Sequence, residues 1–90
     1  MDATTREQLR LSILRHLATN PTRFGLTATL LSQYVRAEGL PSNATEMGVE
    51  IQYLIDKGLV VEVNKAISPE LAAYRVTASG RDLYAQAHGG

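Results

Sequence analysis

The sequence predicts one small α+β domain, mainly helical, in which three helices are followed by two strands and a last helix. Apolar residues recur at helical spacing in four segments, whereas their period changes to two in two short β-branched segments. Glycine or proline follows each of the first three helical segments, as expected where helices stop. Ninety residues suffice for one domain with one modest core. The helices are expected at about 5–19, 28–38, 44–57 and 78–87, and the strands at about 59–63 and 72–76.

The first predicted helix has a wide apolar arc. Thr4 and Thr5 are its candidate N-caps, because threonine oxygens can accept hydrogen bonds from the amides of the first turn. The arc indicates either a helix buried on two sides by its own domain or a helix that also forms a homodimer contact. Its apolar residues are Leu9, Leu11, Ile13, Leu14, Leu17 and Ala18.

The loop before the second helix contains Phe24 and Leu26, which are expected to anchor it to the core. A short extra strand near residues 24–26 would fit the same apolar pattern. Thr27 then caps the second helix, and Gly39 ends it. The apolar face of this helix is formed by Leu30, Leu31, Tyr34 and Val35.

The third helix is amphipathic and net acidic. Asn43 together with Glu46 forms a capping box that starts it, and Gly58 stops it. On a helical wheel its buried face consists of Ala44, Met47, Ile51, Leu54 and Ile55. The same helix carries the acids Glu46, Glu50 and Asp56 against the single base Lys57.

The two strands form a predicted β-hairpin with a long tip. In the first strand Leu59, Val61 and Val63 share one face, and in the second strand Tyr74 and Val76 share one face. Thr77 then caps the short last helix.

Two stretches, "YLIDKGLV" and "YRVTASGRDLY", make the chain resemble the winged helix-turn-helix domain of small bacterial transcriptional regulators of the MarR, PadR and ArsR kind. In those families a helix ends in glycine and runs into the first wing strand, and the second wing strand leads into a threonine-capped helix. The resemblance covers roughly residues 27 to 87. It implies that residues 30–38 are the first helix of the helix-turn-helix, residues 43–57 the recognition helix, and residues 64–71 the wing tip.

The exposed side of the third helix supplies the candidate DNA-binding residues. Its glutamine can pair with adenine, its threonine and valine can contact a thymine methyl group, and its glutamate can accept from cytosine. The first turn of the helix can hold a phosphate, and nearby bases can contact others. These candidates are Ser42, Asn43, Thr45, Glu46, Val49, Gln52, Tyr53, Arg36, Lys65 and Arg75, with Arg23 added if its loop points the same way.

Several of these residues also have a purely structural interpretation. Glu46 is explained by the capping box, and Arg75 by a pair with Glu62 across the hairpin. Tyr53 would then pack against the wing. Glu50 lies near the boundary of the buried face, and the sequence gives it no structural role.

Two functions remain open on the sequence alone. The resemblance favours binding of double-stranded DNA by a bacterial or phage transcriptional regulator. The formal net charge of zero and the acidic third helix favour instead a protein-interaction or assembly module, because non-specific DNA affinity comes mostly from Lys and Arg. The exposed Val49 and Tyr53, with Ile67 and Leu71 in the wing loop, would then bind another protein.

The residue types argue against catalysis, cofactors and metals. There is no cysteine, and the two histidines do not have the spacing of zinc ligands. Gly39, Gly48, Gly58 and Gly80 are isolated, so no phosphate-binding loop is expected, and no nucleophile motif is present. The polar N-terminal stretch is unlike a signal peptide, and no apolar run approaches the length of a membrane helix. The sequence therefore predicts a cytoplasmic protein that is not an enzyme.

Overall fold

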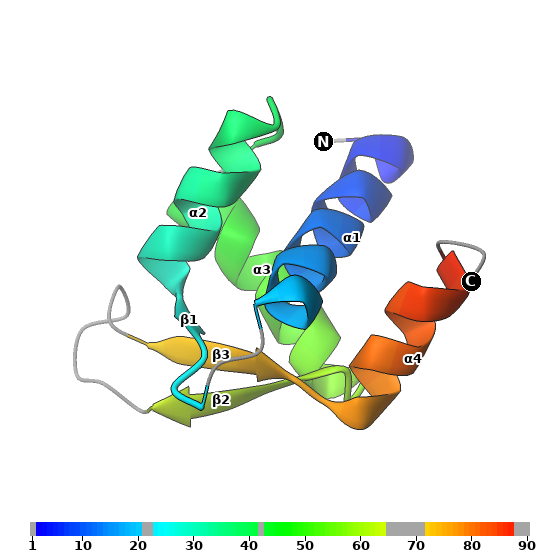
Figure 1. The fold of residues 1–90 in the computed structure, drawn as a ribbon. Helices are drawn as coiled ribbons and strands as arrows, with labels where there is room; N and C mark the ends of the chain where they lie inside the picture. The colour runs from blue at the N-terminus through cyan, green and yellow to red at the C-terminus, as the bar shows by residue number, and fades with distance from the viewer. Residues whose placement is uncertain (1, 21–22, 42, 65–71, 88–90) are drawn as a thin grey trace.

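The helices and strands follow one another in the order that the sequence predicts, with the short extra strand present. The computed structural model describes residues 2–20, 23–41, 43–64 and 72–87, and Figure 1 shows its fold. Two candidate site residues, Ser42 and Lys65, lie outside these ranges, as do Ile67 and Leu71. The elements are α1 (Ala3–Thr19), β1 (Leu26–Thr27), α2 (Ala28–Ala37), α3 (Ala44–Asp56), β2 (Val60–Asn64), β3 (Ala73–Val76) and α4 (Ala78–Ala87).

Side-chain caps start the first three helices. The hydroxyl of Thr27 accepts from the amide of Leu30 at 3.2 Å, and Asn43 Oδ1 accepts from the amide of Glu46 at 2.8 Å. The prediction for α1 was wrong, because Asp2 caps it by accepting from the amide of Thr5 at 2.8 Å. Asp2 lies three residues before Thr5 and offers its carboxylate to the amides of the first turn. The helix therefore begins before both threonines.

The sheet has three antiparallel strands in the order β1-β3-β2. Glu62 lies opposite Tyr74, whereas Arg75 lies opposite Val61. Side chains alternate between the two faces of a sheet, so the predicted pair of Arg75 with Glu62 is wrong. Val60 is fully buried, while Val61 is 43% exposed on the outer face.

Helix α1 lies at the centre of the packing, because it contacts α2, α3, α4 and β3. Figure 1 shows the helices standing above the sheet, with α2 and α4 at opposite sides of the molecule. One core joins all of these elements. Its buried residues include Leu9, Ile13, Leu14 and Leu17 from α1, Leu31 and Val35 from α2, Met47, Ile51 and Leu54 from α3, and Val60 and Val76 from the sheet.

The loop before β1 differs from its predicted packing. Leu26 is buried, but Phe24 is 78% exposed, so only one of the two expected anchors reaches the core. The reason lies in Gly25, which has φ of +73° and would bring a Cβ to 2.3 Å from the carbonyl oxygen of Tyr74. Only glycine fits this close approach, and the turn that it makes leaves Phe24 pointing outward.

Candidate nucleic-acid interface

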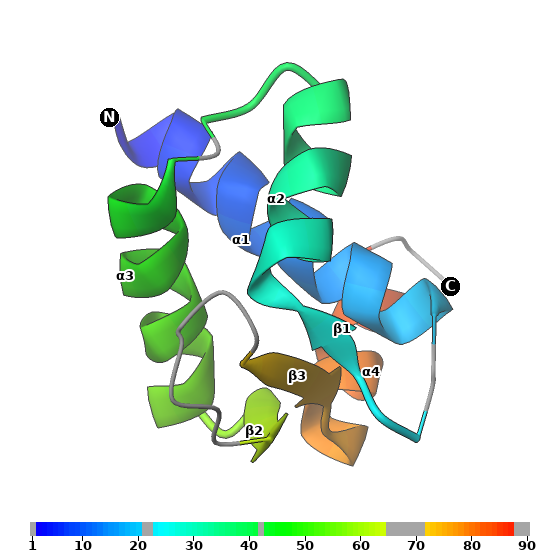
Figure 2. The same ribbon diagram turned by 90° about the vertical axis from the view of Figure 1, so that its left-hand side faces the viewer.

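A glycine ends α2 before the connection to α3. Gly39 has φ of +77°, and its amide donates to the carbonyl of Arg36 at 2.9 Å, which closes the last turn of α2. Asn43 then caps α3. Figure 2 shows α3 along the left edge of the molecule, so one long side of this helix faces away from the rest of the chain. A helix held in this way can enter a groove that is wider than itself.

The two long sides of α3 differ in chemistry. The inner side buries Met47, Ile51 and Leu54, as the sequence predicts, while Ala44 is exposed. The outer side is nearly flat and bears small or neutral side chains along most of its length. It is formed by Ala44, Thr45, Gly48, Val49, Gln52, Tyr53 and Asp56.

Glu50 is turned into the protein and does not face outward. Its side chain is 1% exposed, and its Oε1 accepts from Arg10 Nε of α1 at 2.6 Å. Its Oε2 lies 3.6 Å from Arg6 Nε, which is an ion pair but too long for a hydrogen bond. The view that this acid has no structural role is therefore wrong, and the central charge of α3 is removed from its outer side.

Arg10 also stacks on Tyr53. Its guanidinium carbon lies 3.6 Å from the centre of the Tyr53 ring, and Lys57 Nζ lies 5.6 Å from the same centre. Tyr53 thus packs against Arg10 of α1; its predicted packing against the wing involves the wing tip, residues 65–71, which lie outside the described residues. Burial alone would lower the pKa of Arg10, but the hydrogen bond to Glu50 and the negative charge of Glu50 outweigh it and raise that pKa. The guanidinium is therefore charged at neutral pH.

The remaining polar contacts on α3 are local. Gln52 Nε2 donates to Asp56 Oδ1 at 2.8 Å, which leaves the amide oxygen of Gln52 available to a partner. Glu46 is half-buried beside the cap, and its Oε2 accepts no hydrogen bond from any described residue. Of the three acids in the helix, only Asp56 lies fully on the outer side.

The candidate phosphate contacts separate into two places. Arg36 lines a groove between α2 and α3 with Asn43 and Gly48, so it adjoins the outer side of α3. Arg75 instead lines a small cavity with Asn20, Gly25 and Arg81, and none of the residues around this cavity belongs to α3. The structure thus brings Arg36 to the candidate surface and does not bring Arg75 there.

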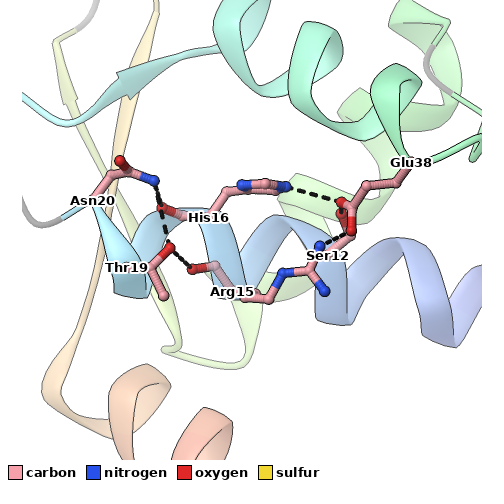
Figure 3. A network of polar contacts seen from close by, with 6 residues as sticks. All are labelled: Ser12, Arg15, His16, Thr19, Asn20 and Glu38. Carbon is pink, nitrogen blue, oxygen red and sulfur yellow. Dashed lines mark hydrogen bonds and ion pairs between the residues drawn. The ribbon is translucent and has the colours of Figure 1, made fainter.

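A second polar cluster ties α1 to the end of α2. Figure 3 shows Ser12, Arg15 and His16 around the carboxylate of Glu38, the C-cap residue of α2. Ser12 Oγ donates to Oε1 of Glu38, His16 Nε2 lies 2.9 Å from the same oxygen, and Arg15 pairs with Oε2. Serine, histidine and acid do come together here, but Ser12 is buried and bonded to the acid rather than to His16. This arrangement lacks the serine–histidine contact that activates a nucleophile.

Burial is the main cause that lowers the pKa of His16, and the charge of Arg15 lowers it further. The ring is also stacked on Tyr34, with 4.9 Å between the ring centres. The neutral imidazole with its proton on Nε2 can donate to Glu38, so the contact does not require a charged ring. No group of His, Asp and Glu side chains in the described ranges has the arrangement of a metal site.

The functional contact that the sequence did not reveal is the one between Arg10 and α3. A signal for it existed, because Glu50 lies about 40° from Leu54 and about 60° from Met47 on the helical wheel, at the edge of the buried face. A carboxylate at a buried position needs a base, and Arg6 and Arg10 are spaced one helical turn apart on α1. What the sequence could not indicate is which helix supplies that base.

The fold matches that of a MarR family regulator from Neisseria meningitidis, with a TM-score of 0.62 and 18% sequence identity. The match covers 90% of this chain and 51% of that chain, so this chain spans about half the length of the solved relative. It confirms the winged-helix resemblance that was predicted from the sequence, and at this identity it shows the fold alone. No family model and no curated protein matches the sequence. Among the described helices, none is long and apolar enough to cross a membrane.

Proposed function

We propose that this protein binds double-stranded DNA through the outer side of α3 and acts as a small bacterial or phage transcriptional regulator. The observation that carries the proposal is the sorting of charge on this helix. Glu50, its central acid, is buried against Arg10, whereas the outer side keeps Thr45, Val49 and Gln52. The outer side therefore presents to a polyanion a surface that is uncharged along most of its length, with Asp56 at its C-terminal end.

The spacing of these three residues supports reading of base edges. Thr45, Val49 and Gln52 follow one another at intervals of four and three residues, so they form one stripe. Threonine and valine suit the methyl group of thymine, and the free amide oxygen of Gln52 suits a base donor. The N-terminal half of a recognition helix is the part that meets the bases, which favours Thr45 and Val49 most.

Positive charge for the phosphates would come from beside the helix. Arg36 adjoins the N-terminal half of α3 across the groove, and Lys57 is exposed at its C-terminal end. Asn43 and the amides of the first turn add a partial positive charge where the helix begins. We expect these contacts to set the affinity for any sequence, and the stripe on α3 to set the choice among sequences.

The test begins by selecting a preferred site from a random duplex library and then measuring binding by fluorescence anisotropy. Substituting Gln52→Ala or Thr45→Ala should cost about 1–3 kcal/mol on the selected site, the usual worth of a good base contact, and little on mixed-sequence DNA. Substituting Arg36→Gln should weaken binding on both and reduce the salt slope by about one.

Gln86→Ala is the matched control, because Gln86 is also an exposed helical glutamine but lies on α4. It should leave both affinities unchanged. Equal losses for Gln52→Ala and Gln86→Ala would show that α3 does not read bases. If the selection enriches no sequence, the protein is not a sequence-specific regulator.

A protein-interaction module remains the second candidate, and exposed apolar side chains favour it. Val49 is 58% exposed on α3, and Phe24 is 78% exposed beside the sheet. A partner protein would bury such side chains, whereas DNA would use Val49 alone. If Val49→Asp abolishes capture of a protein partner and wild-type protein ignores DNA, this second function is the correct one. Sedimentation at high concentration tests self-association separately, and a strict monomer would exclude the homodimer.

A further inference from the structure

Helix α1 contacts α3 through a directional polar group as well as through apolar packing. One guanidinium, that of Arg10, makes two contacts with α3: the 2.6 Å hydrogen bond to Glu50 and the 3.6 Å stack on Tyr53. Glu50 and Tyr53 are three residues apart, so on the helix they stand about 60° apart around the axis and about 4.5 Å apart along it. A single fixed group that contacts both points resists rotation of α3 as well as sliding.

We propose that Arg10 is a positioning residue for the outer side of α3, and that it fixes the rotation of this helix through Glu50 and Tyr53. The proposal rests on the proposed function, because it concerns the surface that would read DNA. The apolar contacts of Met47, Ile51 and Leu54 hold α3 at its depth in the core. Such contacts are not directional, and they tolerate small rotations.

Stability does not explain the buried pair. Glu50 is 1% exposed, and its Oε2 has no hydrogen-bond partner among the described residues, so the carboxylate is only partly satisfied. Removing a charge from water is costly, and a well-packed apolar pair of similar volume is often as stable or more stable. The best-attested role of such buried ionic groups is to select one arrangement among similar ones. Here the arrangement is the rotation of α3 relative to α1.

A small rotation of α3 would displace the side chains on its outer side. A turn of about 20° moves a side-chain tip that lies about 6 Å from the helix axis by about 2 Å. This shift is larger than the tolerance of a hydrogen bond between an amide and a base edge. It would separate Thr45 and Gln52 from their contacts while leaving the fold and the phosphate contacts in place. The effect of losing Arg10 should therefore appear in the choice of sequence.

The test uses the double variant Arg10→Met with Glu50→Leu, which removes both charges and leaves the net charge unchanged. We expect it to fold and to unfold at the same or a higher urea concentration. Its preference for a selected site over mixed-sequence DNA should fall about tenfold or more, the discrimination that one misplaced base contact removes. The salt slope should stay the same, because neither residue is placed at a phosphate.

A matched control exists in the second polar cluster, where Arg15 and Glu38 join α1 to the end of α2. The double variant Arg15→Met with Glu38→Gln also keeps the net charge, and glutamine can still accept from Ser12 and His16. It should leave the sequence preference unchanged.

A second measurement separates this proposal from the function on which it rests. Residual dipolar couplings of backbone amides report the angle between α1 and α3 and the rotation of α3 without any DNA. We expect these couplings to change along α3 in the Arg10→Met, Glu50→Leu variant and to remain constant in the control. If the couplings change but wild-type protein binds no DNA, the proposed function fails and the positioning role stands. Unchanged couplings, or an unchanged sequence preference in a protein that does bind DNA, would overturn the proposal.

Discussion

Gly48 is the residue on α3 whose identity nothing inside the described chain explains. It lies in the middle of the helix, and apart from its chain neighbours and the nearby backbone of α3 itself, no described atom stands within 4 Å of where a Cβ would be. Gly25, in contrast, is required by a close approach to the backbone of β3. Glycine inside a helix costs about 1 kcal/mol relative to alanine, so this position reduces stability without improving the packing of the described residues.

Substituting Gly48→Ala should therefore raise the free energy of unfolding by about 0.5–1 kcal/mol. Urea denaturation followed by circular dichroism measures this change. Gly48→Leu should also remain folded, but it should weaken DNA binding, because its side chain would stand between the helix and the groove. A destabilised Gly48→Ala variant would mean that the space beside Gly48 is filled in solution.

Glu50 shows why part of the candidate site could not be predicted from the sequence. Its wheel position near the buried residues was visible in the sequence, but its partner Arg10 is 40 residues away in the chain. Helical periodicity fixes which side of a helix is buried, and says nothing about which helix covers that side. The caps at Thr27 and Asn43 involve residues only three apart, so the sequence was sufficient for them.

The contact between α1 and α2 at Glu38 should make the stability of the protein depend on pH. His16 belongs to this contact, and burial together with Arg15 lowers its pKa below the ordinary value of about 6.5. The unfolded chain therefore binds a proton more readily than the folded chain does. Stability from this group is fully present above the unfolded pKa and is lost as the pH falls toward the folded pKa.

We expect the free energy of unfolding to decrease when the pH is lowered from about 7.5 to about 5.5, with His16 as a contributor. His16→Gln keeps a side-chain N–H for Glu38 and cannot titrate, so it should flatten this decrease. Urea denaturation of both proteins at several pH values measures the difference. An equal slope in the variant would show that His16 has the same proton affinity in the folded and unfolded chain.

In the sheet, the sequence predicted where the strands lie but not which face of each strand is buried. Its strand segments were visible from their β-branched residues, but the register places Val60 inside and Val61 outside. A shift of one residue exchanges the two faces of a strand, and the alternation in a run of valines cannot decide between them. The position of Arg75 could not be predicted for the same reason, because the register decides on which face of the sheet it lies. In the structure Arg75 lies near Asn20 and Arg81 and not near α3.

The whole molecule is neutral, with nine basic and nine acidic side chains. Arg6 and Arg10 both pair with the buried Glu50, and Arg15 pairs with Glu38. Burial of Glu50 against Arg10 removes an acid from the surface of α3, which changes the distribution of charge and not its sum. We expect modest non-specific affinity and a shallow salt slope, because few cations adjoin α3.

The proposed function requires that this winged-helix domain bind DNA although α3 is acidic by sequence. Anisotropy of fluorescent mixed genomic duplexes, titrated with wild-type protein at low salt, tests it most directly. We expect a dissociation constant of about 1–100 μM at physiological salt and a lower one at low salt, with log K falling linearly with log salt, as for non-specific binders. No binding at low salt and about 100 μM protein, the weak end of that range, would contradict it.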